Sequence, residues 1–310
     1  MSPFAQAHRR EFVESRPDQL AQVMKLSVIV PTCDRVDHLA ECLRRIEGAD
    51  EIVVADDSQT TETHELVQRY SKDIILVQGP RKGPAANRNK GTYSCSGDWF
   101  VFIDDDCLPA ENWLSEIRNA TARCDVVEGK TICPDKTNHP FEDVVENLTG
   151  DLLWSCNLAV SRSLFERLGG FDEDFLIAGG EDLEFARRLR MSNARIHFAS
   201  GAIVYHPVRR LSFVGLVNKV FQMHWHILYR LKIDSSRSAT FHEILDLLRT
   251  TVRVILSPPL ERNIQGIARL ALEWVFLPTW IVYLFVWEWR FRMKRFLPLK
   301  SPDPEYCDRN

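Results

Sequence analysis

The stretch WFVFIDDDCLP, residues 99–109, places three consecutive aspartates directly after an apolar run. The run at 99–103 is typical of a buried β-strand, because strands that are covered on both faces are almost continuously apolar. Asp104, Asp105 and Asp106 follow at the carboxyl end of this strand. Like charges this close repel one another unless something positive lies among them. The stretch therefore predicts a strand that leads into a charged site.

Three similar apolar runs precede this strand: LSVIV at 26–30, EIVVAD at 51–56 and DIILVQ at 73–78. They alternate with segments of helical spacing, such as Leu39, Leu43 and Ile46. Repeated strand and helix units predict an α/β fold with a mostly parallel sheet that is covered on both faces. In such sheets ligands bind outside the carboxyl ends of the strands, where this sequence has the loops PTCDR, DDS, GPRKG and DDD.

Composition and motifs disfavour several classes of protein. The chain has 310 residues, 45% of them hydrophobic, which is enough for one large domain or two. A net charge of −4 gives no reason to expect a nucleic-acid partner. The eight cysteines contain no C-x-x-C pair, which disfavours a zinc site and favours reduced thiols in the cytoplasm. Neither G-x-G-x-x-G nor the P-loop spacing is present, which disfavours a dehydrogenase or a P-loop NTPase.

The alternation of strands and helices stops near Pro207, which predicts three regions: an N-terminal extension at 1–25, an α/β domain at 26–207 and a helical region at 208–310. The first 24 residues lack the apolar segment of a secretory signal, so we expect the α/β domain to stay in the cytoplasm. Two segments after Pro207 predict helices with broad apolar faces, at 211–232 and 241–256.

The run WVFLPTWIVYLFVW at 274–287 carries no charge and is followed by Arg290, Arg292, Lys294 and Arg295. It is shorter than the about 20 residues that a helix needs to span a bilayer. A tilted span, a helix lying in the membrane surface and a buried terminal helix all remain open. We expect the helical region to bring the protein to the inner face of a membrane, either peripherally or as an anchor.

The aspartates at 104–106 suit a hard divalent cation. Mg²⁺ and Mn²⁺ prefer carboxylate oxygens and readily bridge to phosphate. Asp104 and Asp106 are two residues apart, so in an extended segment their side chains point the same way while Asp105 faces elsewhere. On this motif alone, a solvated loop or a cap for a helix after Pro109 is the alternative.

Other segments occur in a characteristic order: SVIVPTCDRVDHLAECL, VVADDS, GPAANRNKG, FIDDDCLP, CNLAVSRSLFERLGGFDEDF and GGEDLEFARRL. Over about residues 26–207 this set resembles the inverting family 2 glycosyltransferases, whose GT-A fold is a Rossmann-like nucleotide-binding domain. The resemblance implies transfer of a sugar from a nucleotide-diphosphate donor, most readily a UDP-sugar, to a hydroxyl acceptor. We expect a glycan or lipid-linked acceptor in polysaccharide or lipid-linked glycan synthesis, and it is the helical region after Pro207, not the catalytic motifs, that suggests the lipid-linked acceptor.

The resemblance further implies a donor site. The family's D-x-D motif maps onto Asp104 and Asp106, which would hold Mn²⁺ or Mg²⁺ on the diphosphate, with Asp104 also touching the ribose. The remaining nucleotide-binding residues would be Pro31, Thr32, Arg35, Asp57, Arg88 and Asp105. Asp56 could replace Asp57, and turn formation at the strand end is the alternative for both.

The motif GGEDLEFARRL resembles the segment that supplies the catalytic base, which implies Asp182 as the base and Glu181 as its neighbour. A base deprotonates the acceptor hydroxyl as it attacks the anomeric carbon, and one such displacement inverts the configuration. The alternative is that both acids favour the N-terminus of a helix at 182–190. His206 ends the strand GAIVYH, and the resemblance makes it a third metal ligand, with a structural histidine as the alternative.

Trp154 and Asn157 fall in the family's acceptor-side segment, although Trp154 could equally fill the core. His224 and His226 are two residues apart, so on a helix they face apart and are not expected to form a metal site. Two rival functions remain open, namely a sugar-phosphate nucleotidyltransferase and a catalytically silent membrane scaffold with a nucleotide pocket.

Overall fold

The computed structural model describes residues 24–70, 74–137, 139, 141–222, 224–233, 238–256, 271, 275 and 277–293. The predicted N-terminal extension at 1–25 therefore lies outside the described residues, apart from Met24 and Lys25.

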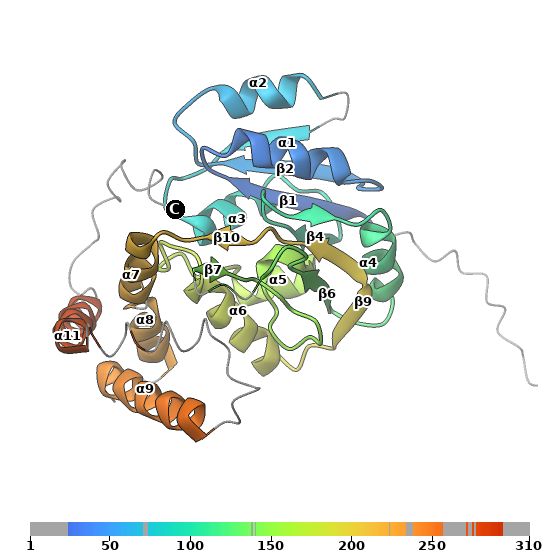
Figure 1. Cartoon of the computed structure of the whole chain (residues 1–310). Helices are drawn as coiled ribbons and strands as arrows, with labels where there is room; N and C mark the ends of the chain where they lie inside the picture. The colour runs from blue at the N-terminus through green and yellow to red at the C-terminus, as the bar shows by residue number, and fades with distance from the viewer. Residues whose placement is uncertain are drawn as a thin grey trace, which may run out of the picture.

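A central sheet of eight strands runs in the order β3-β2-β1-β4-β8-β6-β9-β5 (Figure 1). Its strands are β1 (Leu26–Thr32), β2 (Glu51–Asp56), β3 (Ile74–Gln78), β4 (Trp99–Phe102), β5 (Leu108–Pro109), β6 (Val126–Ile132), β8 (Leu158–Ser161) and β9 (Ile196–Tyr205). The pairs β1–β2, β2–β3, β1–β4 and β6–β9 are parallel. β8 is antiparallel to both of its neighbours, and β5 is antiparallel to β9. The predicted α/β fold with a mostly parallel sheet is confirmed.

Helices of the α/β domain cover the sheet: α1 (Val36–Arg45), α2 (Glu62–Gln68), α3 (Pro84–Thr92), α4 (Trp113–Thr121), α5 (Arg162–Leu168) and α6 (Gly180–Met191). A short antiparallel pair, β7 (Glu142–Asp143) with β10 (Arg209–Arg210), lies outside the main sheet.

Two hydrophobic clusters form the core of the α/β domain, one on each face of β1. Val28 and Val30 belong to the cluster that contains the α1 residues Leu39 and Leu43, whereas Ile29 belongs to the other. This division follows from the period of two along a strand. The second cluster is rich in aromatic rings; for example, the rings of Phe171 and Phe185 lie 4.5 Å apart. Because both faces of β1 are packed, all of its residues are buried.

The parallel register decides where the site forms. β1 pairs with both β2 and β4 in the same direction, so these three strands end at one edge of the sheet. The loops after them begin at Cys33, Asp57 and Ile103. The polar segments that follow these strands therefore meet, as the sequence predicts.

The helical region contains α7 (Phe213–Gln222), α8 (His224–Ile233), α9 (Ala239–Leu256) and α11 (Leu277–Met293). The predicted helix at 211–232 is thus two helices in the structure. α8 contacts α6 of the α/β domain as well as α9 and α11. Among the described residues, none of the helices has both the length and the apolar character needed to cross a bilayer.

Candidate active site

The loop after β1 is fixed by Asp105. The Thr32 hydroxyl donates to Asp105 Oδ2 at 2.7 Å, and an Arg35 nitrogen lies 2.5 Å from Asp105 Oδ1. Burial raises the pKa of Asp105 to about 7, although Arg35 opposes this rise. Thr32 and Asp105, which were both predicted to contact the nucleotide, therefore contact each other. Pro31, a third predicted contact, is buried in β1. Of the residues predicted in this loop, Arg35 is the one with an exposed side chain, at 38%.

Asp57 lies at the end of β2, where three loops meet. Its amide donates to Thr32 O at 2.9 Å, and its Oδ1 accepts from the Arg81 amide at 2.8 Å. A Cβ at Gly79 would come within 2.0 Å of Asp57 Oδ1, so only glycine fits this close approach. Burial raises the pKa of Asp57 to about 6, although the hydrogen bond from the Arg81 amide acts to lower it. Asp56 instead accepts from the Ser58 amide, which is the turn role that the sequence left open.

The glycine before α3 brings two distant loops together. Gly83 has φ +89°, and α3 then begins at Pro84. A Cβ at Gly83 would lie 2.1 Å from the carbonyl oxygen of Leu176. The loop that leads into α3 is thus packed backbone to backbone against the segment that precedes Glu181 and Asp182.

Arg88 connects the two acidic groups of the site. One of its nitrogens lies 2.6 Å from Asp104 Oδ1, and another lies 3.1 Å from Glu181 Oε1. The Arg88 side chain is only 5% exposed. Burial disfavours its charge, but Asp104, Asp182 and Glu181 outweigh burial and raise the pKa of Arg88. A single buried cation therefore links the predicted donor-side and base-side carboxylates.

Glu181 and Asp182 differ in how they are bonded. Glu181 Oε2 accepts from the Gly179 amide at 2.6 Å, so both of its oxygens have partners. Asp182 Oδ1 has no hydrogen-bond partner within normal geometry among the described residues, although the hydroxyl and amide of Ser155 lie near this carboxylate and act to lower its pKa. Burial raises the pKa of Glu181 to about 7, and burial also raises the pKa of Asp182 against the effect of Arg88. Asp182 is therefore the acid of this pair with an oxygen left to accept a proton.

A second cluster surrounds Asp106. Ligand atoms of Asp106, Cys107 and His206 all lie within 4.8 Å of one another, and all three residues are buried. Arg209 and Arg35 lie 2.6 Å and 3.1 Å from Asp106 Oδ2. Burial would raise the pKa of Asp106, but Arg209, His206 and Arg35 lower it to about 2. Asp106 is thus an ionised carboxylate at ordinary pH.

The hydrogen bond of His206 decides which of its nitrogens could bind a metal. Nδ1 lies 2.9 Å from Pro207 O, and a carbonyl oxygen can only accept, so Nδ1 carries the proton. In a neutral ring, Nε2 then has the free lone pair, and it lies 3.7 Å from Asp106 Oδ1. An imidazole held this way beside a carboxylate fits Mn²⁺ or a similar divalent ion.

The structure groups the predicted metal ligands differently from the sequence. Asp106 and His206 lie together, but Asp104 pairs with Arg88 and is not in the candidate metal cluster. The sequence analysis missed Cys107 and Arg209. Cys107 directly follows Asp106 in DDDC, and Arg209 lies three residues after His206 in HPVRR, so closeness in the sequence was the available signal.

Asn157 has a structural place rather than an open one. Its Oδ1 accepts from Trp113 Nε1 at 2.9 Å, and its Nδ2 donates to Lys130 O and Ala202 O. The side chain is buried, and both its oxygen and its nitrogen are engaged in these hydrogen bonds. The structure therefore does not support a role for Asn157 in binding the acceptor. Trp154 is partly buried and packs against the core.

Glu128 is a further residue that the sequence analysis missed. Its buried carboxylate accepts from Asn147 Nδ2 and from the amides of Asp151, Leu152 and Leu153. Asp151 and Leu153 both have positive φ, a conformation that costs free energy in non-glycine residues. Glu128 therefore holds a strained loop that leads directly to Trp154. The signal in the sequence was an acid directly after the two valines that begin the strand at 126–132.

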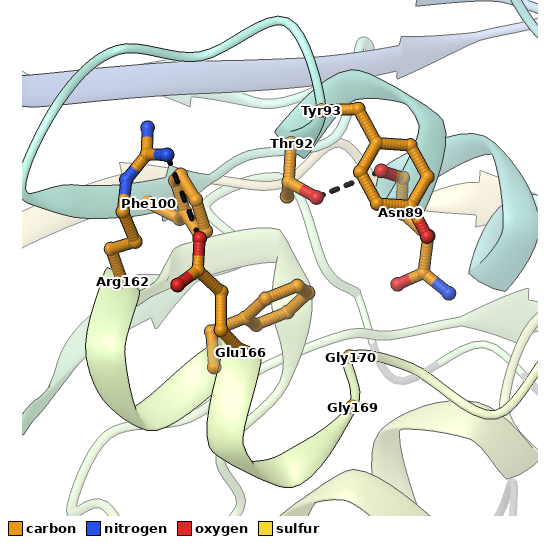
Figure 2. Close-up of a pocket in the computed structure, with 9 residues that line it drawn as sticks. Asn89, Thr92, Tyr93, Phe100, Arg162, Glu166, Gly169 and Gly170 are labelled. Atoms are coloured by element: carbon orange, nitrogen blue, oxygen red, sulfur yellow. Dashed lines mark hydrogen bonds and ion pairs between the residues drawn. The ribbon is translucent and has the colours of Figure 1, made fainter.

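Figure 2 shows a pocket of about 320 Å³ beside the C-terminal end of α3, lined by residues that include Tyr93, Phe100, Arg162 and Glu166. Arg162 lies 3.6 Å from Glu166 and also donates to two backbone carbonyls, so its charge is already balanced. None of the predicted site residues lines this pocket. The candidate active site is therefore the cluster of carboxylates at the sheet edge.

Comparisons with known proteins agree with this geometry. Residues 27–166 match the model of the family described as Glycosyl transferase family 2. Residues 138–209 match the model described as N-terminal domain of galactosyltransferase. The two matches together span the sheet and the segments that carry Asp104, Asp106 and Asp182.

Two curated relatives extend the comparison. The pre-mycofactocin glycosyltransferase of Mycobacterium tuberculosis is 26% identical over 225 residues, which cover 66% of this chain and 47% of the relative. Glycosyltransferase AglE of Haloferax volcanii is 24% identical over 220 residues, which cover 64% of this chain and 71% of the relative. The chain thus spans about half the length of the first relative.

Two solved structures share the fold. The mannosyltransferase PcManGT of Pyrobaculum calidifontis, in complex with GDP-Man and Mn²⁺, has a TM-score of 0.52 at 20% identity, covering 90% of this chain and 77% of its own. Residues 1–349 of S. aureus TarS have a TM-score of 0.54 at 18% identity, covering 91% of this chain and 95% of their own. At these identities the likeness shows the fold alone. Residues 27–166 of the chain therefore match glycosyl transferase family 2, and the α/β domain has the GT-A fold.

Proposed function

We propose that the protein is a metal-dependent inverting glycosyltransferase that moves a sugar from a nucleotide-diphosphate-sugar, a UDP-sugar first of all, to a hydroxyl acceptor. The observation that carries the proposal is the bridge made by Arg88 between Asp104 and Glu181. Transfer requires a donor and a base on opposite sides of one reacting carbon. Arg88 contacts Asp104, a carboxylate of the proposed donor side, and Glu181, which is the neighbour of the proposed base.

The donor side combines nucleotide and metal groups. In this proposal Arg35 and Asp57 would contact the nucleotide, and Asp104 with Arg88 would contact the sugar diphosphate. Asp106 and His206 Nε2 would hold Mn²⁺ or Mg²⁺. When bound, that ion would neutralise charge on the departing diphosphate. Arg209 is 43% exposed beside Asp106, so it can turn toward the same phosphates.

The acceptor side depends on Asp182. Its unpaired Oδ1 can accept the proton of the acceptor hydroxyl as the oxygen attacks the anomeric carbon. A raised pKa brings this carboxylate nearer to the pH at which a general base works well. Glu181, which is held by Arg88 and Gly179, orients the helix start that carries Asp182.

We further propose a glycan or lipid-linked acceptor and a site of action at the inner face of a membrane. One relative supports a lipid-linked acceptor by its name alone, the GalNAc(5)-diNAcBac-PP-undecaprenol beta-1,3-glucosyltransferase of Campylobacter jejuni. It is 38% identical over 91 residues, which cover 26% of this chain and 29% of the relative.

The test is a screen of nucleotide sugars with and without Mn²⁺, read by release of nucleoside diphosphate and by the anomeric configuration of the product. The expected result is metal-dependent diphosphate release with an inverted product. Release of inorganic pyrophosphate from a sugar phosphate and a nucleoside triphosphate would instead identify a nucleotidyltransferase. Donor binding with no turnover on any acceptor class would favour the silent scaffold.

A further inference from the structure

Helix α11 has two apolar faces, and only one of them packs on the protein. Trp280 and Leu284 are buried against residues of α8 and α9, including Ile227 and Leu247. Glu288, on the same side, accepts hydrogen bonds from the amides of Ala239 and Thr240 at the start of α9. This side of α11 therefore belongs to the core of the helical region.

The opposite face of α11 is exposed and almost wholly apolar. Its members, which we call the outer face, are Val282 (64% exposed), Phe285 (50%), Val286 (48%), Trp289 (63%) and Met293 (40%). Their spacing of three and four residues puts them on one side of the helix. Val275, 72% exposed, continues the same line toward the N-terminus. Single exposed apolar residues are ordinary, but a continuous row of this kind marks an interaction surface.

The charges around the outer face have one sign. Arg290 and Arg292 are exposed at the C-terminal end of α11, and Lys294 and Arg295 follow in the sequence. The carboxylate within α11, Glu288, is buried on the other side and is spent on α9 and Arg292. The outer face is therefore an apolar row that ends beside two exposed arginines, Arg290 and Arg292, which we call the basic cluster.

We infer that the outer face docks on the surface of an anionic bilayer, with the axis of α11 parallel to the membrane. Apolar residues and a tryptophan suit the boundary between headgroups and acyl chains, and the basic cluster suits anionic lipid. A spanning arrangement is disfavoured because α11 has 17 residues and one of its sides is packed on α8 and α9. A second copy of the chain with its α11 packed in parallel would bring the two basic clusters together, which like charges oppose. An antiparallel pair of α11 helices would keep the clusters apart, and the test below distinguishes this pair from docking on a bilayer.

The arrangement in the molecule fits this docking. Figure 1 shows α11 at the edge of the molecule, beside α8 and away from the sheet. Docking needs neither donor nor metal, so its failure would leave the proposed transfer reaction untouched.

The test is flotation of the full chain with vesicles of phosphatidylcholine, alone or with 30% phosphatidylglycerol. We expect binding to the anionic vesicles and at least tenfold weaker binding to the neutral ones, because each basic residue near the surface contributes about fivefold. The variant V282Q/F285Q/W289Q should bind at least tenfold more weakly. The matched control Y93Q/M191Q changes two equally exposed apolar residues, 79% and 65% exposed, on the α/β domain and should bind as the unchanged chain does.

Two further readouts separate the rival occupants. In vesicles with brominated lipids, tryptophan emission should be quenched more by bromines near the headgroups than by bromines near the bilayer centre. Stronger quenching from the centre would overturn the in-plane arrangement. Full vesicle binding by the triple variant, with a helical circular dichroism spectrum unchanged, would overturn the docking surface. A dimer in light scattering that the triple variant loses, without any vesicle binding, would assign the outer face to a second copy.

Discussion

Asp106 shows how a residue's neighbours decide what its charge can do. It is 5% exposed yet ionised, because Arg209, His206 and Arg35 offset the cost of burying its charge. Asp105, one residue earlier, has its pKa raised to about 7 by burial and serves the loop after β1. The pKa of Asp106 is thus lowered while that of the adjacent Asp105 is raised, although both belong to one sequence motif.

We predict that Asp106→Asn removes the metal dependence of donor binding. An amide is a poorer ligand for a hard cation than a carboxylate, so the gain in donor affinity on adding Mn²⁺ should fall at least tenfold. Calorimetric titration of a nucleotide sugar with and without Mn²⁺ measures this gain. Asp125→Asn, which alters an exposed partner of Arg195, is the control. An unchanged Mn²⁺ effect in Asp106→Asn would remove Asp106 from the metal site.

Asp182→Asn should leave donor affinity within about twofold and lower the rate of transfer by roughly 10²-fold or more, the range expected for a lost general base. The reason is that Asp182 has an unpaired oxygen whereas Glu181 does not. Single-turnover kinetics with a saturating donor measure the chemical step separately from binding. A variant that transfers at the full rate would require another base.

Asp57 gives a pH-dependent prediction. Its folded pKa of about 6 lies above its ordinary value of 3.8, so the folded state binds more protons than the unfolded state between these values. Stability should therefore fall as the pH rises from about 4 to 6, by about 1 to 2 kcal/mol after allowance for solvent screening. Urea unfolding across this range should show a smaller fall in Asp57→Asn. An equal fall in both proteins would mean that Asp57 titrates normally.

At the scale of elements, strands were easier to foresee than the pairing between them. Each of the apolar runs at 26–30, 51–56 and 99–103 became a strand, because continuous apolar character and a turn at each end are local properties. The antiparallel place of β8 between β4 and β6 was not foreseen, since pairing depends on residues far apart in the chain. The helix predicted at 182–190 starts at Gly180.

The site divides in the same way. Asp57, Asp104 and Asp106 could be chosen from the sequence because they follow strand ends, whereas Arg88 and Asp182 were chosen from the resemblance to the glycosyltransferase family. The division of labour between Asp104 and Asp106 could not, because it depends on where Arg88 and Arg209 reach in space. Glu128 could be noticed as a buried acid, but the loop it holds is a matter of tertiary structure.

Glu288 ties α11 to α9, and this contact should be measurable. Its carboxylate accepts from the Thr240 amide at 2.8 Å, at a helix N-terminus where negative charge is favourable. Glu288→Gln should lower the free energy of unfolding by about 1 kcal/mol, the usual size of a capping contribution. Chemical denaturation followed by circular dichroism measures the change. As a control, Glu65→Gln, which alters an exposed pair with Arg69, should change the free energy of unfolding by less than about 0.5 kcal/mol. If both variants lost the same amount, Glu288 would not be acting as a cap of α9.

For the whole molecule, the boundary predicted at Pro207 separates two regions that share a core. Trp225 and Leu228 of α8 pack with Phe175 and Ile177, which lie in the segment before Glu181. The Lys232 ammonium also pairs with Asp172 and, at 2.6 Å, with Asp174. The helical region therefore supports the segment that leads to the proposed base.

We predict that Lys232→Met lowers the transfer rate several-fold and lowers donor affinity by a smaller factor. The substitution loosens the segment that leads to the proposed base, and this segment reaches the donor side only indirectly, through Gly83 and Arg88. Lys219→Met is a matched control, since Lys219 joins the same two regions by pairing with Asp143. Steady-state kinetics with varied donor and acceptor separate the two effects. Equal losses in both variants would point to general destabilisation.

The bridge made by Arg88 also limits which segments of this enzyme can be exchanged with those of a relative. Asp104 and Glu181 lie on different segments of the chain, and both depend on one guanidinium that is buried with them. A chimaera that takes residues 26–104 from a relative would bring in a new cation without the acid that evolved beside it. Donor preference should therefore be transplantable only when residues 179–182 are exchanged in the same step.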